Sequence, residues 1–473
     1  MFPLIFLLIC LVALLLIIWV VLYEDILSPS VLLVISFIGA TLLLLKGAER
    51  LEIKEYSYET VFVFIVGIFF FILGGMIRAL SETRKISPYS GLKNPKPLII
   101  NKSIYVVFVL FAAFVAYVQF KYELAHVGYV GTFTEIVSDY RDEAVKEGVE
   151  SDPFVALSSR IIFSLQPLLI FLTLYNKIVC KRKLGNWFVI IPCIITYVIC
   201  IFVIAGSRGK IFTILFQILF ALSICHNLAD SKGNKDSNSW KNLSGNKIWI
   251  KFALLTILIG IPTFYYVGVV QGKKYSDMSL FEPVENYFSY GLIHLNHTVT
   301  SGVYETKDIG GWSFAGLYAL MNKFGANYPF YDSVPFYDRY GNTLTLFGRW
   351  YQDFNIVGVI VMSLLVGYFF SFIYYRMIYA RDNSSVIRNS VFYVFFMNTI
   401  LMASYDDWVK GLLTLNGIFQ ILFLYCILLF VTTKLNKKSR TIFVIINKRQ
   451  DKGYKSVSID KGDIVQLIKK SKK

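Results

Sequence analysis

The stretch "VIAGSRGKIF", residues 203–212, places two basic side chains in a short turn between two apolar runs. Arg208 and Lys210 are residue types that bind phosphate, because the planar Arg fork bonds two oxygens at once and Lys supplies a point charge. The second apolar run begins near 210, and a helix N-terminus already presents unpaired N–H groups and partial positive charge. The positive end of the helix dipole repels the two cations, which is unfavourable. An anion bound between them and the helix N-terminus would be attracted by both. The alternative is that both side chains snorkel to lipid phosphates.

Three further arginines are candidates for the same chemistry. Arg160, in "ALSSRIIFSLQP", falls inside another apolar run, where a charge is costly and often functional. Arg349, in "LFGRWYQDF", is a second phosphate ligand or, equally, an interfacial anchor beside Trp350. Arg339, in "FYDRYGN", could instead pair with a neighbouring aspartate.

Groups that could accept a proton are fewer. Asp353 is one, although an Asp at the start of a helix is more commonly a cap. His294 and His297, in "IHLNHTV", titrate in a useful range and share one helix face, with ordinary polar packing as the alternative. Asp406 and Asp407, in "SYDDWVK", are the closest carboxylate pair, which we interpret as a solvated turn. No cluster of Cys and His indicates a metal, and we expect no cofactor.

The elements that position these residues are membrane spans. The chain of 473 residues is 56% hydrophobic and has a mean hydropathy of +0.58, which is too apolar for a soluble domain. A hydrocarbon core needs about 20 helical residues per crossing, and apolar runs of that length recur along the chain. The sequence predicts an all-α polytopic membrane protein of about eleven spans, near 2–22, 29–45, 59–78, 103–122, 156–176, 187–205, 210–226, 248–270, 352–375, 389–405 and 411–433.

The distribution of Lys and Arg predicts the orientation of these spans, because basic residues are retained on the cytoplasmic side. The basic segment 434–473 is predicted to be a cytoplasmic tail that follows a transmembrane domain, residues 1–433. Alternation from this tail leaves about 31 of the 47 basic residues inside, so the net charge of +16 does not call for nucleic acid. The turn with Arg208 then lies outside. Glu24 and Asp25 fall inside, and become outer candidates only if one early span is miscounted.

Two sizeable segments are predicted outside. In 123–155 apolar residues recur at helical spacing, opposite an acidic face. This pattern predicts a short amphipathic helix on the membrane surface. The second, a large loop at 271–351, is rich in aromatic residues. Its stretch "WSFAGLYALMNKFGAN" predicts a helix with one apolar face: Phe314, Leu317, Tyr318, Met321 and Phe324. The aromatic rings form an interfacial belt or, alternatively, line a groove in which sugars pack on rings.

The order of several short motifs resembles a known family. The stretch "GNTLTLFGRWYQDFNIVGVIVMSLLVGYFFSFIY" is similar to the characteristic segment of Wzy-type oligosaccharide repeat-unit polymerases, the O-antigen and capsule polymerases. Asn355 stands where that family often has Gly. "NYFSYGLIHLNHTV", "GGWSFAGLYALMNKFG" and "AGSRGK" also resemble family segments, so the likeness covers roughly residues 160–375.

The resemblance implies a GT-C-like glycosyltransferase at the outer face of the bacterial inner membrane. Such an enzyme transfers a growing glycan from undecaprenyl diphosphate onto the next lipid-linked repeat unit, and works with a flippase and a chain-length regulator. On this basis Arg208, Asp353 and His294 are the candidate catalytic residues. The candidate ligands of the diphosphate are Arg208, Lys210, Arg160, Arg349 and Arg339. The candidate glycan-binding residues are Asn342, Tyr351, Trp312 and Tyr287.

Two rival functions fit the same features less well. An O-antigen ligase has similar spans and handles the same lipid diphosphate, but the motif order favours a polymerase. A flippase or transporter for lipid-linked glycan would more often show an internal repeat, which this sequence lacks, and would not explain an aromatic loop of about eighty residues.

Overall fold

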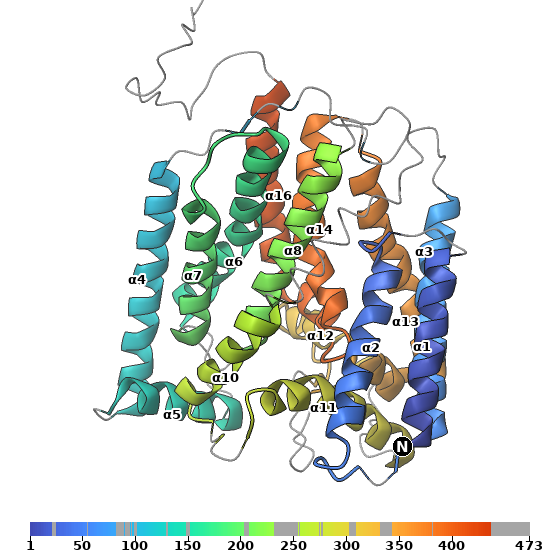
Figure 1. The fold of residues 1–473 in the computed structure, drawn as a ribbon. Helices are drawn as coiled ribbons and strands as arrows, with labels where there is room; N and C mark the ends of the chain where they lie inside the picture. The colour runs from blue at the N-terminus through green and yellow to red at the C-terminus, as the bar shows by residue number, and fades with distance from the viewer. Residues whose placement is uncertain are drawn as a thin grey trace, which may run out of the picture.

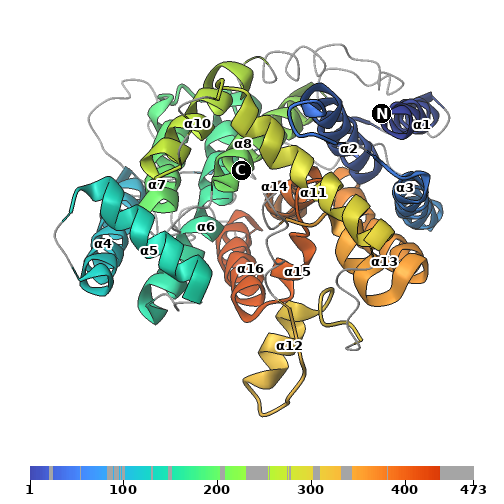
Figure 2. The same ribbon diagram turned by 90° about the horizontal axis from the view of Figure 1, so that it is seen from below.

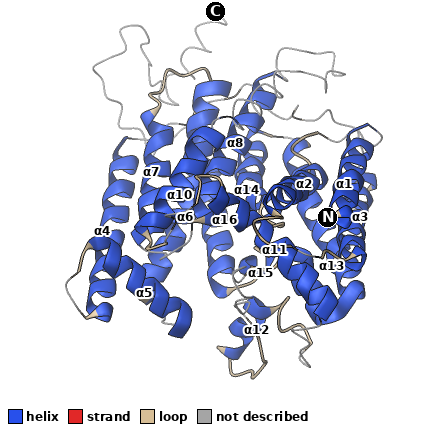
Figure 3. Cartoon of the chain, turned by 60° about the horizontal axis from the view of Figure 1, so that its bottom comes forward, coloured by secondary structure: helices blue, strands red, loops and turns tan. Residues whose placement is uncertain are grey.

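The structure, a computed structural model, describes residues 1–436 except 21–24, 54, 82–88, 90–94, 96, 99–101, 129–130, 148–151, 203–207, 231–253, 255, 274, 276–277, 302–308, 332–342 and 381. The described residues form helices, turns and loops without a strand (Figure 3). The helices are α1 (Phe2–Val20), α2 (Pro29–Gly47), α3 (Tyr58–Leu80), α4 (Lys102–Val127), α5 (Phe133–Glu147), α6 (Pro153–Leu174), α7 (Trp187–Phe202), α8 (Gly209–Asp230), α10 (Ile261–Val270), α11 (Glu282–Ser301), α12 (Ala315–Asn322), α13 (Leu346–Ile378), α14 (Asn383–Leu401), α15 (Val409–Leu412) and α16 (Leu415–Asn436). Short π-helical turns follow α6 at Tyr175–Val179 and precede α10 at Thr256–Gly260.

Within the described part of the chain, eight helices are long and apolar enough to cross a membrane: α1, α2, α3, α4, α6 with its π-helical turn, α8, α13 and α16. The chain is therefore a membrane protein with many helical spans. Two predicted spans, 187–205 and 248–270, correspond to the shorter apolar helices α7 and α10. The predicted span 389–405 corresponds to α14, which lies among α2, α6, α8, α13 and α16 (Figure 2).

Local sequence sets where several helices begin. Ser28 accepts the N–H of Val31 at 3.2 Å, and Pro29 occupies the first turn of α2, where its missing N–H costs nothing. Asp152 and Pro153 repeat this arrangement at the start of α6. Thr345 caps α13, so this helix begins six residues before the predicted boundary at 352.

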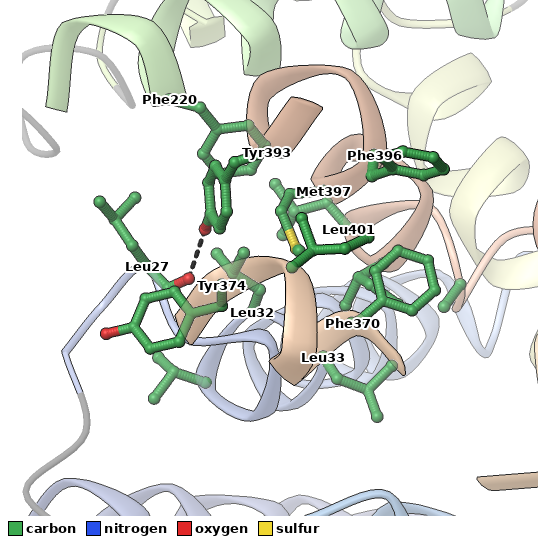
Figure 4. Close-up of a cluster of buried hydrophobic side chains, with 14 of the residues drawn as sticks. Leu27, Leu32, Leu33, Phe220, Phe370, Tyr374, Tyr393, Phe396, Met397 and Leu401 are labelled. Atoms are coloured by element: carbon green, nitrogen blue, oxygen red, sulfur yellow. Dashed lines mark hydrogen bonds between the residues drawn. The ribbon is translucent and has the colours of Figure 1, made fainter. Parts of the chain in front are cut away.

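The main core forms where α2, α8, α13 and α14 meet (Figure 4). Phe220 of α8 and Tyr393 of α14 pack edge to face with ring centroids 5.7 Å apart. The Tyr393 hydroxyl donates to the carbonyl of Leu27, which satisfies the one polar atom of this buried ring. The core thus holds α14 against the start of α2.

Helices α3 and α13 pack with their backbones in close contact. A Cβ atom at Gly74 would lie 2.2 Å from the Leu364 carbonyl oxygen, and one at Gly367 would lie 2.1 Å from the Phe71 carbonyl oxygen. Nearer its N-terminal end, α13 is kinked at Asn355, whose φ of 52° and ψ of −151° are not helical. A positive φ favours glycine, the residue expected there from the family resemblance.

One end of the bundle carries α5, α11, α12, α15 and the start of α8, and we refer to it as the α11 end (Figure 1, bottom; Figure 2). The described helices of the two large segments predicted to lie outside the membrane, α5, α11 and α12, are at this end, whereas residues 180–186 lie at the opposite end. The predicted amphipathic helix in 123–155 is confirmed as α5.

Helix α11 lies across the bundle and is fastened near both of its ends. Glu285, which is buried, pairs with Lys46 and with Arg50, the latter at 3.2 Å. Asn296 accepts the Ser57 N–H and the Thr60 hydroxyl, both at 2.9 Å. Both contacts tie α11 to the connection between α2 and α3.

The predicted helix in 312–325 is confirmed as α12, but its apolar face is not its packing face. Ala315 and Gly316 are buried instead, and the Cβ position of Gly316 lies 2.8 Å from the Lys410 carbonyl oxygen of α15. Phe324 remains 83% exposed because the small residues, rather than the large ones, allow close approach to α15.

Candidate functional site

Arg208 immediately precedes α8 and lies in a cage of aromatic rings at the α11 end. Its guanidinium carbon is 4.6 Å from the centroid of Phe264, 5.8 Å from that of Tyr287 and 5.9 Å from that of Tyr275. The guanidinium donates a hydrogen bond to the Tyr275 hydroxyl. No carboxylate lies within ion-pair distance of Arg208 in the part of the chain that the structure describes.

The glycine that follows is needed for this cage. A Cβ atom at Gly209 would lie 2.4 Å from the Tyr287 hydroxyl oxygen and 3.3 Å from the Trp408 ring. Any larger residue would force the Tyr287 side chain to shift. The Gly after Arg208 therefore lets rings from α10 and α11 enclose the guanidinium.

Lys210 and Arg160 form a second cationic group beside the first. The Lys210 ammonium lies 5.1 Å from the centroid of Phe163 and 5.4 Å from that of Trp408. Arg160 approaches from α6, about two turns from the helix start, and is close enough for the two charges to repel. The Arg160 Nε is buried without a hydrogen-bond partner, and neither cation has an ion pair, among the described residues. Two like charges held together in this way favour an anion between them.

The segment 405–408 links the cations to α11. Tyr405 stacks on Tyr287 with centroids 3.7 Å apart and planes 17° from parallel. Asp406 pairs with Arg349 at 3.6 Å. The interpretation of Asp406 and Asp407 as a solvated turn is wrong for Asp407, which is 1% exposed. Burial raises the Asp407 pKa to about 6, and Oδ1 accepts the Val409 N–H at 2.8 Å. The hydrogen bonds of Asp407 are local, to the N–H groups of Val409 and Lys410, and its Oδ2 is buried without a hydrogen-bond partner among the described residues.

Arg349 is engaged by protein groups, in contrast to Arg208. It is 2% exposed, faces the Trp312 ring at 5.9 Å and bonds the Tyr331 carbonyl oxygen at 3.4 Å in addition to pairing with Asp406. Its charge is therefore compensated within the protein. Its Nε is buried without a hydrogen-bond partner among the described residues, as is that of Arg160, so the ion pair with Asp406 is what distinguishes Arg349 from the other cations.

Asp353 fastens the segment before α12 to α13. Its two carboxylate oxygens accept the N–H groups of Trp312 at 3.1 Å and Ser313 at 2.5 Å. Trp312 itself is 2% exposed and stacks on Tyr331 with centroids 4.9 Å apart. These contacts place the carboxylate and the indole in a packed junction.

His294 is fully buried in α11, and its Nδ1 lies within hydrogen-bond distance of the Thr343 carbonyl oxygen. Burial lowers its pKa to about 4, so the imidazole is neutral at pH 7. His297, one turn further along, is partly exposed and contacts Ser301. The two histidines share a helix face, as expected from their spacing, but differ in burial.

We expect His294 to make stability depend on pH. A folded pKa below the unfolded value of about 6.5 means that its contribution is complete above pH 6.5 and is lost as pH falls toward 4. Relative to His294→Gln, the wild type should lose about 3 kcal/mol between pH 7 and 4. Melting of both proteins in detergent at the two pH values measures this, with His297→Gln as a control. An identical pH response in wild type and His294→Gln would contradict a neutral buried imidazole.

The remaining candidates do not gather around the cations. Tyr351 lines a cavity of about 390 Å³ together with Tyr58, Glu59, Phe62 and Val299. Asn342 and Arg339 lie outside the described residues, as does Glu24. Asp25 lies four residues before α2, and the Tyr89 hydroxyl donates to its carboxylate at 3.5 Å.

The structure thus brings together Arg160, Arg208, Lys210 and Tyr287, while Arg349, Asp353 and His294 lie in packed contacts along α11 and α13. Phe264 and Tyr275 of the cage, Trp408 beside Lys210 and Tyr405 beside Tyr287 were missed from the sequence. They come from separate segments whose only sequence signal is aromatic composition. Comparison of the chain with protein-family models, curated proteins and solved structures finds no match.

Proposed function

We propose that this chain joins lipid-diphosphate-linked oligosaccharide repeat units into a polysaccharide at the outer face of a bacterial inner membrane. The observation that carries the proposal is the group of three cations, Arg160, Arg208 and Lys210. None of them has a carboxylate partner among the described residues, and they lie at the end of the bundle where the aromatic loop also folds. The motif order described above supports the same reaction class.

The chemistry of this reaction fits the charge of the site. An acceptor hydroxyl attacks the anomeric carbon of the donor glycan, and the carbon–oxygen bond to the diphosphate breaks. The diphosphate leaves with the electron pair and becomes more negative, while the hydroxyl proton is finally released to water. Cations held in place before the reaction, in surroundings poor in water, stabilise this charge as it develops.

The aromatic rings around Arg208 hold its guanidinium in place and leave its positive charge available to an anion. Phe264 and Tyr287 hold the Arg208 guanidinium by cation–π attraction, which orients it without neutralising it. The Tyr275 hydroxyl accepts one of its N–H groups and leaves the others for an anion. A partner carboxylate in place of these rings would compete with phosphate.

Deletion of the gene in the native host tests the proposal. We expect the surface glycan to lose its long ladder on a gel while the core with a single repeat unit remains. Loss of every repeat unit from the core would instead support a ligase. An unchanged ladder would contradict both functions.

A further inference from the structure

Two amphipathic helices lie at the α11 end, and only one of them has its apolar face covered by protein. In α5, which packs on α4, Ile136 is 3% exposed and Val137 is fully buried. In α12 and the turn after it, the apolar side chains are open instead: Phe324 is 83% exposed, and Leu317 and Met321 are each 37% exposed. The described part of the chain therefore does not cover the apolar face of α12.

The apolar face of α12 has a fixed direction, because the helix is held on both sides. Before the helix, the carboxylate of Asp353 in α13 accepts the N–H groups of Trp312 and Ser313. After it, the Asn322 side chain accepts the Tyr328 N–H and donates to the Tyr328 carbonyl oxygen, both at 2.8 Å, which folds the following turn back on α12. A helix fastened in this way cannot turn its apolar side chains inward.

The position of α12 along the bundle matches the edge of a membrane span. A Cβ atom at Gly316 would lie 2.7 Å from Cγ2 of Thr414, and the next residue, Leu415, begins the candidate span α16. Leu415 is 45% exposed and Leu422 is 58% exposed, so lipid covers this face of α16. Figure 2 shows α12 extending outward beyond α15 and α16. Its exposed apolar side chains therefore lie where the lipid-covered surface of α16 begins.

The charge of this segment also fits a bilayer. Between residues 309 and 331 the chain has one charged side chain, that of Lys323, and no Asp or Glu. Lys323 is exposed, and a Lys side chain can place its ammonium at the lipid phosphates while its stem lies along apolar surface. In contrast, α5 carries five acidic residues, which favour water and repel anionic lipid. The two helices thus differ in charge as well as in the covering of their apolar faces.

We propose that α12 and the turn after it insert Leu317, Met321 and Phe324 into the bilayer leaflet that faces the α11 end. Amphipathic helices that lie in a membrane surface bury their apolar face at the boundary between headgroups and acyl chains. The inserted helix anchors α15, against which Gly316 packs. Trp408, the residue immediately before α15, lies over the ammonium of Lys210, so the bilayer supports one wall of the cation site.

Photocrosslinking identifies what contacts Phe324. The photoreactive residue p-benzoylphenylalanine replaces Phe324, Leu422 or Glu135 in the full chain, one at a time, and each protein is irradiated in nanodiscs of phosphatidylethanolamine and phosphatidylglycerol. Leu422, exposed on α16, is the positive control, and Glu135, exposed on α5, is the negative control. We expect mass spectrometry to find attached phospholipid at positions 324 and 422 but not at 135. Crosslinking of position 324 to a second copy of the chain, or no lipid there while position 422 carries one, would overturn the proposal.

Hydrogen exchange provides a second measurement that needs no photoreactive group. In the same nanodiscs, the amide hydrogens of residues 315–330 should exchange about 10-fold faster in Phe324→Ser than in wild type, because the variant loses the burial of a phenyl ring in lipid. Phe324→Leu, which remains apolar, should exchange like wild type. Equal exchange in Phe324→Ser and wild type would show that the ring faces water, and would overturn the insertion of α12.

Discussion

Replacing Arg208 with Ala is expected to slow chain elongation by about 10²-fold or more. The variant loses a guanidinium that aromatic rings hold in place and that no carboxylate among the described residues neutralises. An anionic ligand therefore loses its strongest contact. Lys at this position should restore only part of the rate, because an ammonium cannot bond two phosphate oxygens in the geometry of the Arg fork. The measurement is the elongation rate in membranes that contain equal amounts of each protein.

The control for this prediction is a substitution at an arginine that is already paired. Arg50 contacts Glu285, and Arg50→Gln should leave elongation close to wild type because its pair is partly exposed and a second cation, Lys46, remains. Normal elongation by a well-folded Arg208→Ala variant would show that Arg208 only anchors the protein at the bilayer surface.

Replacing Gly74 or Gly367 with Ala is expected to lower the free energy of unfolding by about 1–3 kcal/mol, and the double variant should lose more than either alone. The added methyl groups would lie 2.2 Å and 2.1 Å from backbone carbonyl oxygens of the facing helix. Backbone atoms cannot turn aside as a flexible side chain can, so α3 and α13 would have to separate. The measurement is thermal unfolding in detergent.

Gly39 provides the matched control. It also lies inside an apolar helix, but an added Cβ would meet nothing within 4 Å. Gly39→Ala should therefore raise stability slightly, by about 0.5–1 kcal/mol, because Ala has the higher helix propensity. If Gly74→Ala and Gly367→Ala melt like Gly39→Ala, the two backbones are not in contact.

The positions of the apolar helices could be predicted from the sequence because each reflects a local requirement. The apolar run predicted near 29–45 forms α2, Pro29–Gly47. Its start is marked by a Ser cap and a Pro that can be read directly from the sequence. The transverse course of α11 could not be predicted in this way. Its buried residues include Glu285, Asn286 and Ser289, so no apolar stripe marks the face that packs under the bundle.

The residues of the candidate site also differ in whether the sequence could reveal them. Arg208, Lys210 and Arg160 could be identified because a charge within or beside an apolar run is conspicuous. The difference between Arg208 and Arg349 could not, because Asp406 lies 57 residues after Arg349 and reaches it only through the fold. The burial of Asp407 could not be predicted either, because its neighbour Asp406 reaches Arg349 only through the fold and its own hydrogen bonds, to Val409 and Lys410, look like those of an ordinary turn.

The attachment of α11 limits which elements beside the cations can move. Because Glu285 and Asn296 tie this helix to the α2–α3 connection, α11 acts as a fixed crossbar beneath the bundle. A large hinge motion of α11 would break both attachments and the close packing of Tyr287 on Tyr405. Under the proposed function, bulky glycans would therefore pass Arg208 by displacing shorter elements such as α10, and α11 would stay in place.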